Sequence, residues 1–147
     1  MWRLAVFFVI VSFCQLGRSQ TITVRLIDGK SGKPLSNLHV VIFGIHEARP
    51  GIHKVRTLPI VKEQDTYKVD VTGEEYLQFG AANSTTPRIV QFIPCQKSTV
   101  SADVKEIQAV GSISLNSCSR KSYPVIRGEL IIFVRKVSWW GRWKDFG

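Results

Sequence analysis

The segment Thr21–Ile45 reads TITVRLIDGKSGKPLSNLHVVIFGI, two apolar runs on either side of a turn rich in Gly, Lys and Pro. In its first eight residues apolar and polar side chains alternate, which is typical of a strand with one buried and one wetted face. Gly32 and Pro34 interrupt the alternation, because glycine tolerates a positive φ and proline lacks the N–H donor of a strand ladder. The run Leu38–Ile45 is rich in Val and Ile and predicts a more deeply buried strand.

This segment resembles the opening of carboxypeptidase regulatory-like domains, which are transthyretin-like (prealbumin-like) β-sandwiches found in many secreted proteins. The resemblance lies in a strand, a D-G-K-S-G-K-P-L turn and a second strand. The matching residues are Val24, Leu26, Asp28, Ser31, Gly32, Pro34, Leu35, Val40 and Ile42. The resemblance implies that residues 20–137 form such a β-sandwich module.

Sequence further along the chain resembles the tail of small uncharacterised secreted bacterial proteins that open with this kind of domain. The matching residues are Val104–Ile107, Asn116, Cys118, Gly128–Arg135 and Trp139–Trp140. This second resemblance implies no particular activity.

Short strand-like runs separated by turn residues continue between these two ends. Pro59 interrupts the run Ile52–Val61, which we therefore expect at the edge of a sheet. Residues 46–51 predict a loop, and Val104–Leu115 predicts mainly a strand, although its first half also fits a turn of helix. Further strands are predicted over Thr66–Val71, Tyr76–Ala81, Arg88–Cys95 and Glu129–Val137. The pattern predicts an all-β fold, an Ig-like or prealbumin-like β-sandwich of about seven or eight strands.

Residues 1–19 have the pattern of a secretory signal peptide. Arg3 gives a short positive region, Leu4–Phe13 is almost unbroken apolar sequence, and Gly17 and Ser19 are small residues before the expected cut. The apolar run is about half the length of roughly 20 residues that a membrane span needs. We therefore expect export, to the outside of the cell or to the periplasm and cell envelope.

The charge of the exported part is positive and dispersed. Without residues 1–19 the chain has 18 basic and 11 acidic residues, a net charge of +7. Scattered basic residues are typical of a solvated surface, and they attract anionic envelope polymers without specificity. Because no nucleic-acid-binding motif accompanies them, we expect no specific nucleic-acid partner.

Cys95 and Cys118 are the thiols that remain after removal of the signal peptide. In an exported protein such a pair predicts a disulfide. The enclosed loop has about two dozen residues, for which the chain-entropy model gives roughly 3 kcal/mol of stabilisation. A metal pair is less favoured, since metal-binding cysteines usually follow a close spacing such as C-x-x-C.

Three histidines, His39, His46 and His53, are seven residues apart, and we expect them to be surface or loop residues. The alternative is a small secreted hydrolase or metal-binding protein on a transthyretin-like fold that uses them. A hydrolase of purine breakdown with that fold ends in Tyr-Arg-Gly-Ser, a motif that this chain lacks. The sequence also contains no G-x-S-x-G elbow. We therefore expect no enzyme activity, no catalytic or metal-binding residues and no cofactor.

The tail, residues 138–147, combines aromatic and basic side chains. Its residues Trp139, Trp140, Arg142 and Trp143 are candidates for partner binding, because Trp and Arg dominate interface hot spots. Trp with flanking cations also suits peripheral contact with a membrane surface. The other interpretation is that the rings cover an open end or edge of the sandwich.

The sequence therefore predicts a secreted, non-catalytic binding or structural module whose partner is an unidentified protein or envelope polymer. Besides the hydrolase or metal-binding alternative, a cell-surface carbohydrate-binding or adhesion module that uses the Trp residues of the tail is a second alternative.

Overall fold

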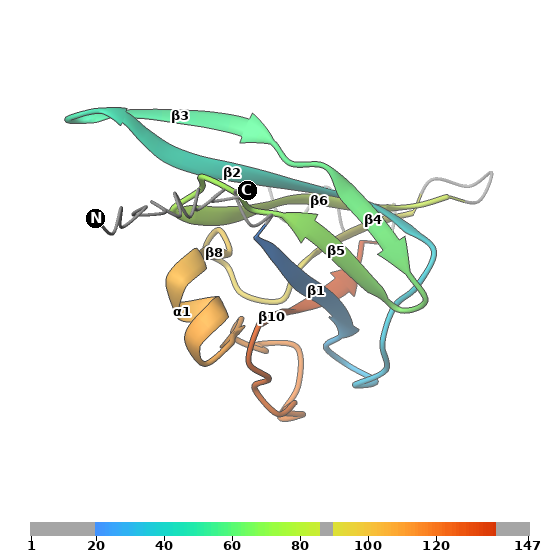
Figure 1. The fold of residues 1–147 in the computed structure, drawn as a ribbon. Coiled ribbons are helices and arrows are strands. Elements are labelled where there is room, and N and C mark those ends of the chain that lie inside the picture. The colour runs from blue at the N-terminus through green and yellow to red at the C-terminus, as the bar shows by residue number, and fades with distance from the viewer. Residues whose placement is uncertain (1–19, 86–89, 138–147) are drawn as a thin grey trace, which may run out of the picture.

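The computed structural model describes residues 20–85 and 90–137, which form ten strands and one short helix (Figure 1). The strands are β1 (Thr21–Asp28), β2 (Leu38–Arg49), β3 (Ile52–Thr57), β4 (Ile60–Glu63), β5 (Thr66–Asp70), β6 (Tyr76–Ser84), β7 (Gln91–Pro94), β8 (Ser101–Asp103), β9 (Ser112–Ile113) and β10 (Glu129–Lys136). The helix is α1 (Val104–Ala109). The all-β fold class is confirmed. The predicted signal peptide, residues 1–19, and the tail, residues 138–147, lie outside the described residues.

The strands form one curled mixed sheet in the order β3-β2-β6-β7-β10-β1-β5-β4, with β8 beside β6 and β9 beside β10. Strand β10 runs parallel to β1 and to β9, and the other pairs are antiparallel. The two edge strands β3 and β4 are separated in the chain by Leu58 and Pro59 alone. At this point the chain passes from one edge of the sheet to the other, so the predicted edge position of residues 52–61 is confirmed.

The main core lies inside the curl, where β2 and β6 lie over β1 and β10 (Figure 1). Leu26 and Ile42 come from opposite sides of this core and are both fully buried. Tyr67 is also buried, and its hydroxyl oxygen accepts a hydrogen bond of 3.1 Å from the Leu38 N–H. Burial raises the pKa of Tyr67, because an apolar environment disfavours the phenolate.

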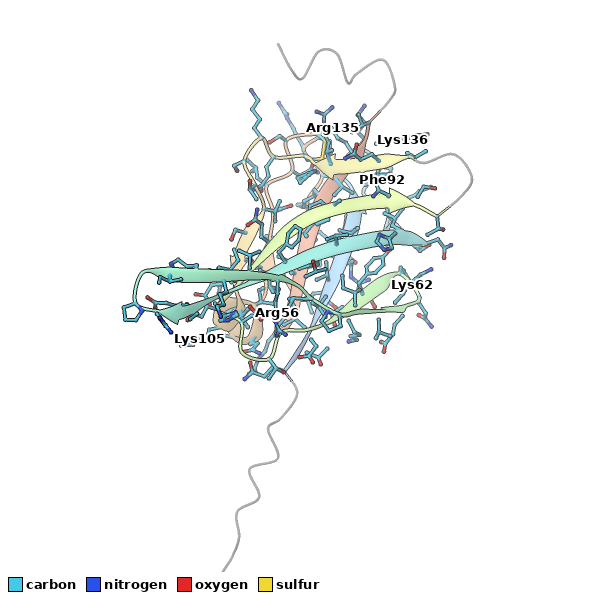
Figure 2. The ribbon with its side chains drawn as sticks, turned by 90° about the horizontal axis from the view of Figure 1, so that it is seen from above. Arg56, Lys62, Phe92, Lys105, Arg135 and Lys136 are labelled. Carbon is cyan, nitrogen blue, oxygen red and sulfur yellow. A yellow bond between two sulfur atoms is a disulfide. The ribbon has the colours of Figure 1, made fainter. Side chains whose placement is uncertain are left out.

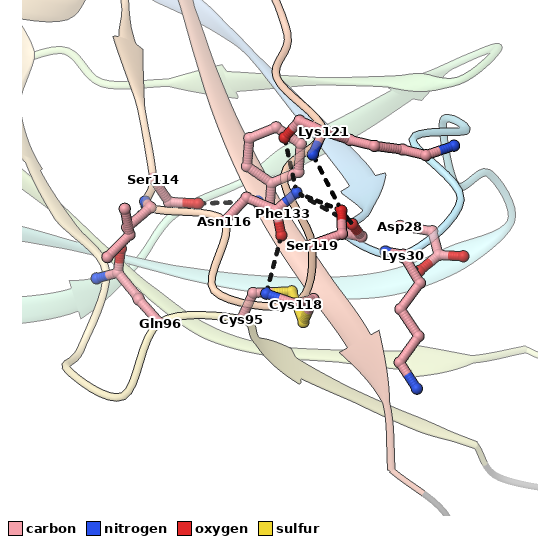
Figure 3. The surroundings of a disulfide bond; sticks show 12 residues. Asp28, Lys30, Cys95, Gln96, Ser114, Asn116, Cys118, Ser119, Lys121 and Phe133 are labelled. Carbon is pink, nitrogen blue, oxygen red and sulfur yellow. Dashed lines mark hydrogen bonds between the residues drawn. A yellow bond between two sulfur atoms is a disulfide. The ribbon is translucent and has the colours of Figure 1, made fainter.

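A second, smaller core lies on the other face of β1 and β10. It contains Ile27, Ile131 and Phe133, and Cys95 and Cys118 pack against them. The structure joins these two cysteines in a disulfide, in agreement with the sequence analysis (Figure 3). Because β10 has apolar residues on both faces, its residues 130–134 are all buried.

The turn after β1 is built by the residues that carry the family resemblance. The Asp28 carboxylate accepts hydrogen bonds from the Ser31 hydroxyl at 2.7 Å and from the Lys30 N–H at 3.1 Å. The hydrogen bond from the Ser31 hydroxyl lowers the pKa of Asp28 most, and the backbone N–H groups of Lys30 and Ser31 lower it further. Gly32 has a φ of 72° and donates its N–H to the Asp28 carbonyl at 2.7 Å. The motif therefore fixes a tight turn.

The structure corrects the prediction of a loop over residues 46–51. Strand β2 continues to Arg49, because β3 pairs with it as far as Ile52, with a register irregularity after Glu47. Only Pro50 and Gly51 form the turn, and Gly51 has a φ of 78°.

The prediction that residues 104–115 are mainly strand is wrong for the first half. Residues Val104–Ala109 form α1, which begins because the Asp103 carboxylate accepts hydrogen bonds from the Lys105 and Glu106 N–H groups. The helix buries Val104 and Ile107, which lie on one face.

Within the described ranges no helix is long and apolar enough to cross a membrane. The chain also has more strands than predicted, because β8 and β9 are very short and Pro59 separates β3 from β4.

Gly29 gives a test of how tightly the disulfide packs against the sheet. A Cβ atom at this buried position would lie 2.3 Å from the Cys95 sulfur and 2.9 Å from the Cys118 Cβ. Such overpacking typically costs about 1–3 kcal/mol. We expect Gly29→Ala to lower the free energy of unfolding by this amount, measured by chemical denaturation. In a Cys95→Ala/Cys118→Ala background the same change should cost less, because the nearest sulfur is gone. An equal cost in both backgrounds would contradict the packing described here.

Candidate binding site

An open cup lies where β6 changes its neighbour. Its residues 76–78 pair with β8 and its residues 82 and 83 pair with β7, so the sheet forks between them. The fork holds a cavity of about 620 Å³, which we call the cup. It is lined by Phe79, Gly80, Ile93, Pro94, Cys95, Gln96, Lys97, Ser98, Thr99, Val100 and Arg135. These residues come from three distant segments of the chain.

Hydrogen bonds of Gln96 hold the wall of the cup. Its side-chain amide nitrogen lies 3.2 Å from the carbonyl oxygens of Ser98 and Thr99 and from the Ser98 hydroxyl. Its side-chain oxygen accepts a hydrogen bond of 3.0 Å from the Leu115 N–H. The wall is therefore tied to Leu115, within the loop that the Cys95–Cys118 disulfide closes, and Cys95 is fixed beside it (Figure 3).

The polar lining of the cup is positively charged. Lys97 and Arg135 contribute cations, and among residues 20–85 and 90–137 no carboxylate side chain lines the cup. Figure 2 shows Arg135 and Lys136 together at the end of β10. The hydroxyl groups of Ser98 and Thr99 add donors that suit a carboxylate or a sulfate. This arrangement can hold an anionic group, since charge-assisted hydrogen bonds are the strong ones.

A buried carboxylate anchors the hairpin of β2 and β3 to the rest of the molecule. The side chain of Glu74 is only 1% exposed, and it contacts His46 Nδ1 at 3.2 Å and the guanidinium of Arg56. Arg56 also donates to the Thr72 carbonyl at 3.1 Å. Gly44 leaves room for this carboxylate, because a Cβ at residue 44 would lie 2.5 Å from the Glu74 carboxyl carbon and would displace that side chain. The Glu74 carboxylate thus holds both strands of the hairpin through polar contacts, with His46 of β2 and Arg56 of β3.

The three histidines lie on this same hairpin, but they are not brought together. His46 contacts Glu74 under the hairpin, whereas His53 pairs in register with Glu47 and therefore faces the opposite side. His39 is exposed near the start of β2. In residues 20–85 and 90–137 no group of three or more His, Cys, Asp or Glu side chains is arranged to hold a metal ion.

The predicted partner-binding residues Trp139, Trp140, Arg142 and Trp143 lie outside the described residues. Sequence reasoning missed the cup and the role of Glu74. Neither follows a local motif, because both depend on pairs of residues that the fold brings together over long separations.

Comparison with known proteins adds no family to this geometry. No family model, curated protein or solved structure matches this chain. The function must therefore be inferred from the residues themselves.

Replacing Glu74 should loosen the hairpin. In Glu74→Ala the Arg56 guanidinium and the His46 ring lose their shared partner; because both side chains are partly exposed and can bind water instead, we expect a cost of about 1 kcal/mol. We expect a lower melting temperature and faster tryptic cleavage after Lys54 and Arg56 in the native protein. The control is Glu75→Ala, since this neighbouring carboxylate is exposed. If both variants are cleaved at the wild-type rate, Glu74 does not anchor the hairpin.

Proposed function

We propose that the chain is an exported, non-catalytic binding module that holds an anionic group of a cell-envelope polymer in the cup. The observation that carries the proposal is the lining of the cup, in which the described residues combine Lys97 and Arg135 with hydroxyl groups and include no carboxylate. An acidic polymer presents many such groups along one chain, so the cup meets them at a high local concentration.

Export is supported by the sequence of residues 1–19 and by the disulfide. Disulfides persist mainly in oxidising compartments, outside the cytoplasm. The bond between Cys95 and Cys118 therefore favours a secreted, periplasmic or cell-envelope location. The same bond fixes one wall of the cup, which links the compartment to the binding site.

A carboxypeptidase regulatory-like β-sandwich is the architecture that we propose for residues 20–137. The support is local: the D-G-K-S-G-K-P-L residues build a hydrogen-bonded turn between β1 and β2. Domains of this kind occur as modules of secreted proteins, which agrees with a binding role.

Binding to alginate, a carboxylated polysaccharide, tests the proposed function. We expect the variant Lys97→Gln/Arg135→Gln to bind at least about tenfold more weakly than wild type in calorimetric titration, a loss of about 1.4 kcal/mol or more. The matched control is Lys62→Gln/Lys105→Gln, which removes the same charge from exposed positions away from the cup (Figure 2). The control should change affinity by less than about threefold, the range expected for screened surface charges.

The single variant Lys97→Gln distinguishes weaker binding from a folding defect. Lys97 is exposed, so its replacement should leave the melting temperature unchanged while still weakening binding. Equal weakening by the cup variant and the control variant would show only the general attraction of a basic protein. Either that result or the absence of binding by wild type would contradict the proposal.

A further inference from the structure

Strand β4 has an unpaired edge. Within residues 20–85 and 90–137 it pairs with β5 alone and ends the strand order of the sheet (Figure 1). The Asp70 N–H of the β5 side donates to the Pro59 carbonyl at 3.4 Å, so Pro59 and every second residue after it face β5. The backbone N–H and C=O groups of Ile60 and Lys62 therefore point away from β5, towards the free edge.

A slot separates this edge from the start of β2. It has a volume of about 340 Å³ and is lined by residues of both strands, among them Val40 of β2 and Ile60 of β4. Its closed end is a backbone hydrogen bond of 2.9 Å from the Leu58 N–H to the Ile42 carbonyl. Beyond this bond, in the described ranges, β2 and β4 have no strand partner on the sides that face each other. A free strand edge is a template for a further extended segment.

The end of β4 exposes an apolar, a cationic and an anionic side chain in succession. Val61 is 63% exposed, and Lys62 and Glu63 are exposed as well. The Lys62 ammonium reaches across the slot to the side-chain oxygen of Asn37. In the described part of the chain neither Lys62 nor Glu63 forms an ion pair. A complementary antiparallel segment therefore has a cation, an anion and an apolar residue, in that order.

The tail contains this order at residues 144–146, which read Lys-Asp-Phe. Placed antiparallel to β4, they put a cation opposite Glu63, a carboxylate opposite Lys62 and an aromatic ring opposite Val61. Cross-strand pairs of opposite charge and of aromatic with β-branched residues stabilise a sheet. In this register Asp145 and Lys62 form the pair that exchanges backbone hydrogen bonds, because Lys62 faces the free edge.

The tail is long enough to reach β4. The Val137 N–H donates to the Gln91 carbonyl at 2.9 Å, Gln91 pairs with Asn83, and Asn83 pairs with His39. His39 lines the slot, so a strand in the slot lies four strand spacings, or about 19 Å, from Val137. Residues 144–146 follow Val137 by seven to nine positions and can extend to about 23–30 Å from it.

Lys62 lies at the end of the slot from which the tail starts. Asn37, which Lys62 contacts, precedes His39 by two residues, and this shift along the strand raises the distance only to about 20 Å. Figure 2 shows Lys62 and Lys136, the last residue of β10, on the same side of the view.

We propose that residues 144–146 pair with the free edge of β4 as a further antiparallel strand of the same chain. Phe146 then covers Val61, and the two charged residues before it pair with Lys62 and Glu63. The proposal does not depend on polymer binding, because none of the β4 residues lines the cup.

Residue-resolved hydrogen exchange tests the proposal. In wild type we expect the Lys62 amide to exchange at least about tenfold more slowly than in a variant that lacks residues 144–147, because a carbonyl of the tail accepts its hydrogen bond. Phe146→Asn should raise the exchange rate of this amide by at least about threefold, since the ring no longer covers Val61. The matched control is Trp139→Asn, which should leave the rate unchanged, because Trp139 lies within about 7 Å of Val137 and does not reach β4.

The Val55 amide is the internal reference. Val55 belongs to the other edge strand, β3, and its N–H points away from β2, because the bond from Leu58 to Ile42 sets the alternation. It should exchange fast in every variant, and circular dichroism should give the same β-sheet signal. Exchange of the wild-type Lys62 amide as fast as that of Val55, or no change after removal of residues 144–147, would overturn the proposal.

Charge reversal tests the register. Glu63→Lys should speed exchange of the Lys62 amide by about threefold, because two cations then face each other across the strands. The double variant Glu63→Lys/Lys144→Glu should bring the rate back to that of wild type. A double variant that exchanges as fast as the single one rules out this pairing.

Contact within one chain is separated from contact between two copies by dilution. The protection of the Lys62 amide should be independent of protein concentration, and light scattering should give the mass of a monomer. Loss of protection on dilution, together with dissociation of a dimer, would overturn the intramolecular proposal and assign the edge of β4 to a second copy.

Discussion

The parallel pairing of β1 with β10 is the constraint on which the rest of the structure depends. It joins residues 23–28 to residues 129–134, which are separated by more than a hundred positions. Both strands are buried on two faces: Leu26 and Ile132 face the main core, and Ile27 and Phe133 face the second core. Closing so long a loop is costly in entropy, so this pair depends on the apolar area that it buries on both faces.

The cup and the hairpin of β2 and β3 lie at the periphery of this central pair. On one side the disulfide clamps residues 95–100, and these form a wall of the cup. On the other side β2 and β6 continue outward into the hairpin with β3, which Glu74 holds from below. The rigid centre therefore carries two different peripheral features, the cationic cup and the hairpin of β2 and β3.

The sequence predicts the parts of the fold that local patterns determine. The alternation in β1, the turn around Gly32 and the apolar run of β10 all follow from neighbouring residues. The end of β2 could not be predicted in this way, because its residues are polar and are held by Glu74, which lies 28 positions after His46. Helix α1 did have a local signal, Asp103 followed by Glu106, but the alternation around Ile113 outweighed it. The cup combines residues 79–80, 93–100 and 135, and no single segment indicates that they meet.

Native-state hydrogen exchange of the exported protein tests the central claim most directly. If the pairing of β1 with β10 holds the fold, the hydrogen-bonded amides of these two strands exchange slowest, with protection that matches the free energy of global unfolding. The paired amides of β2 and β3 near the hairpin turn should exchange faster, because the exposed strand β3 can separate from β2 by local opening while the core stays folded. Protection of β1 and β10 no greater than that of the hairpin would contradict the account.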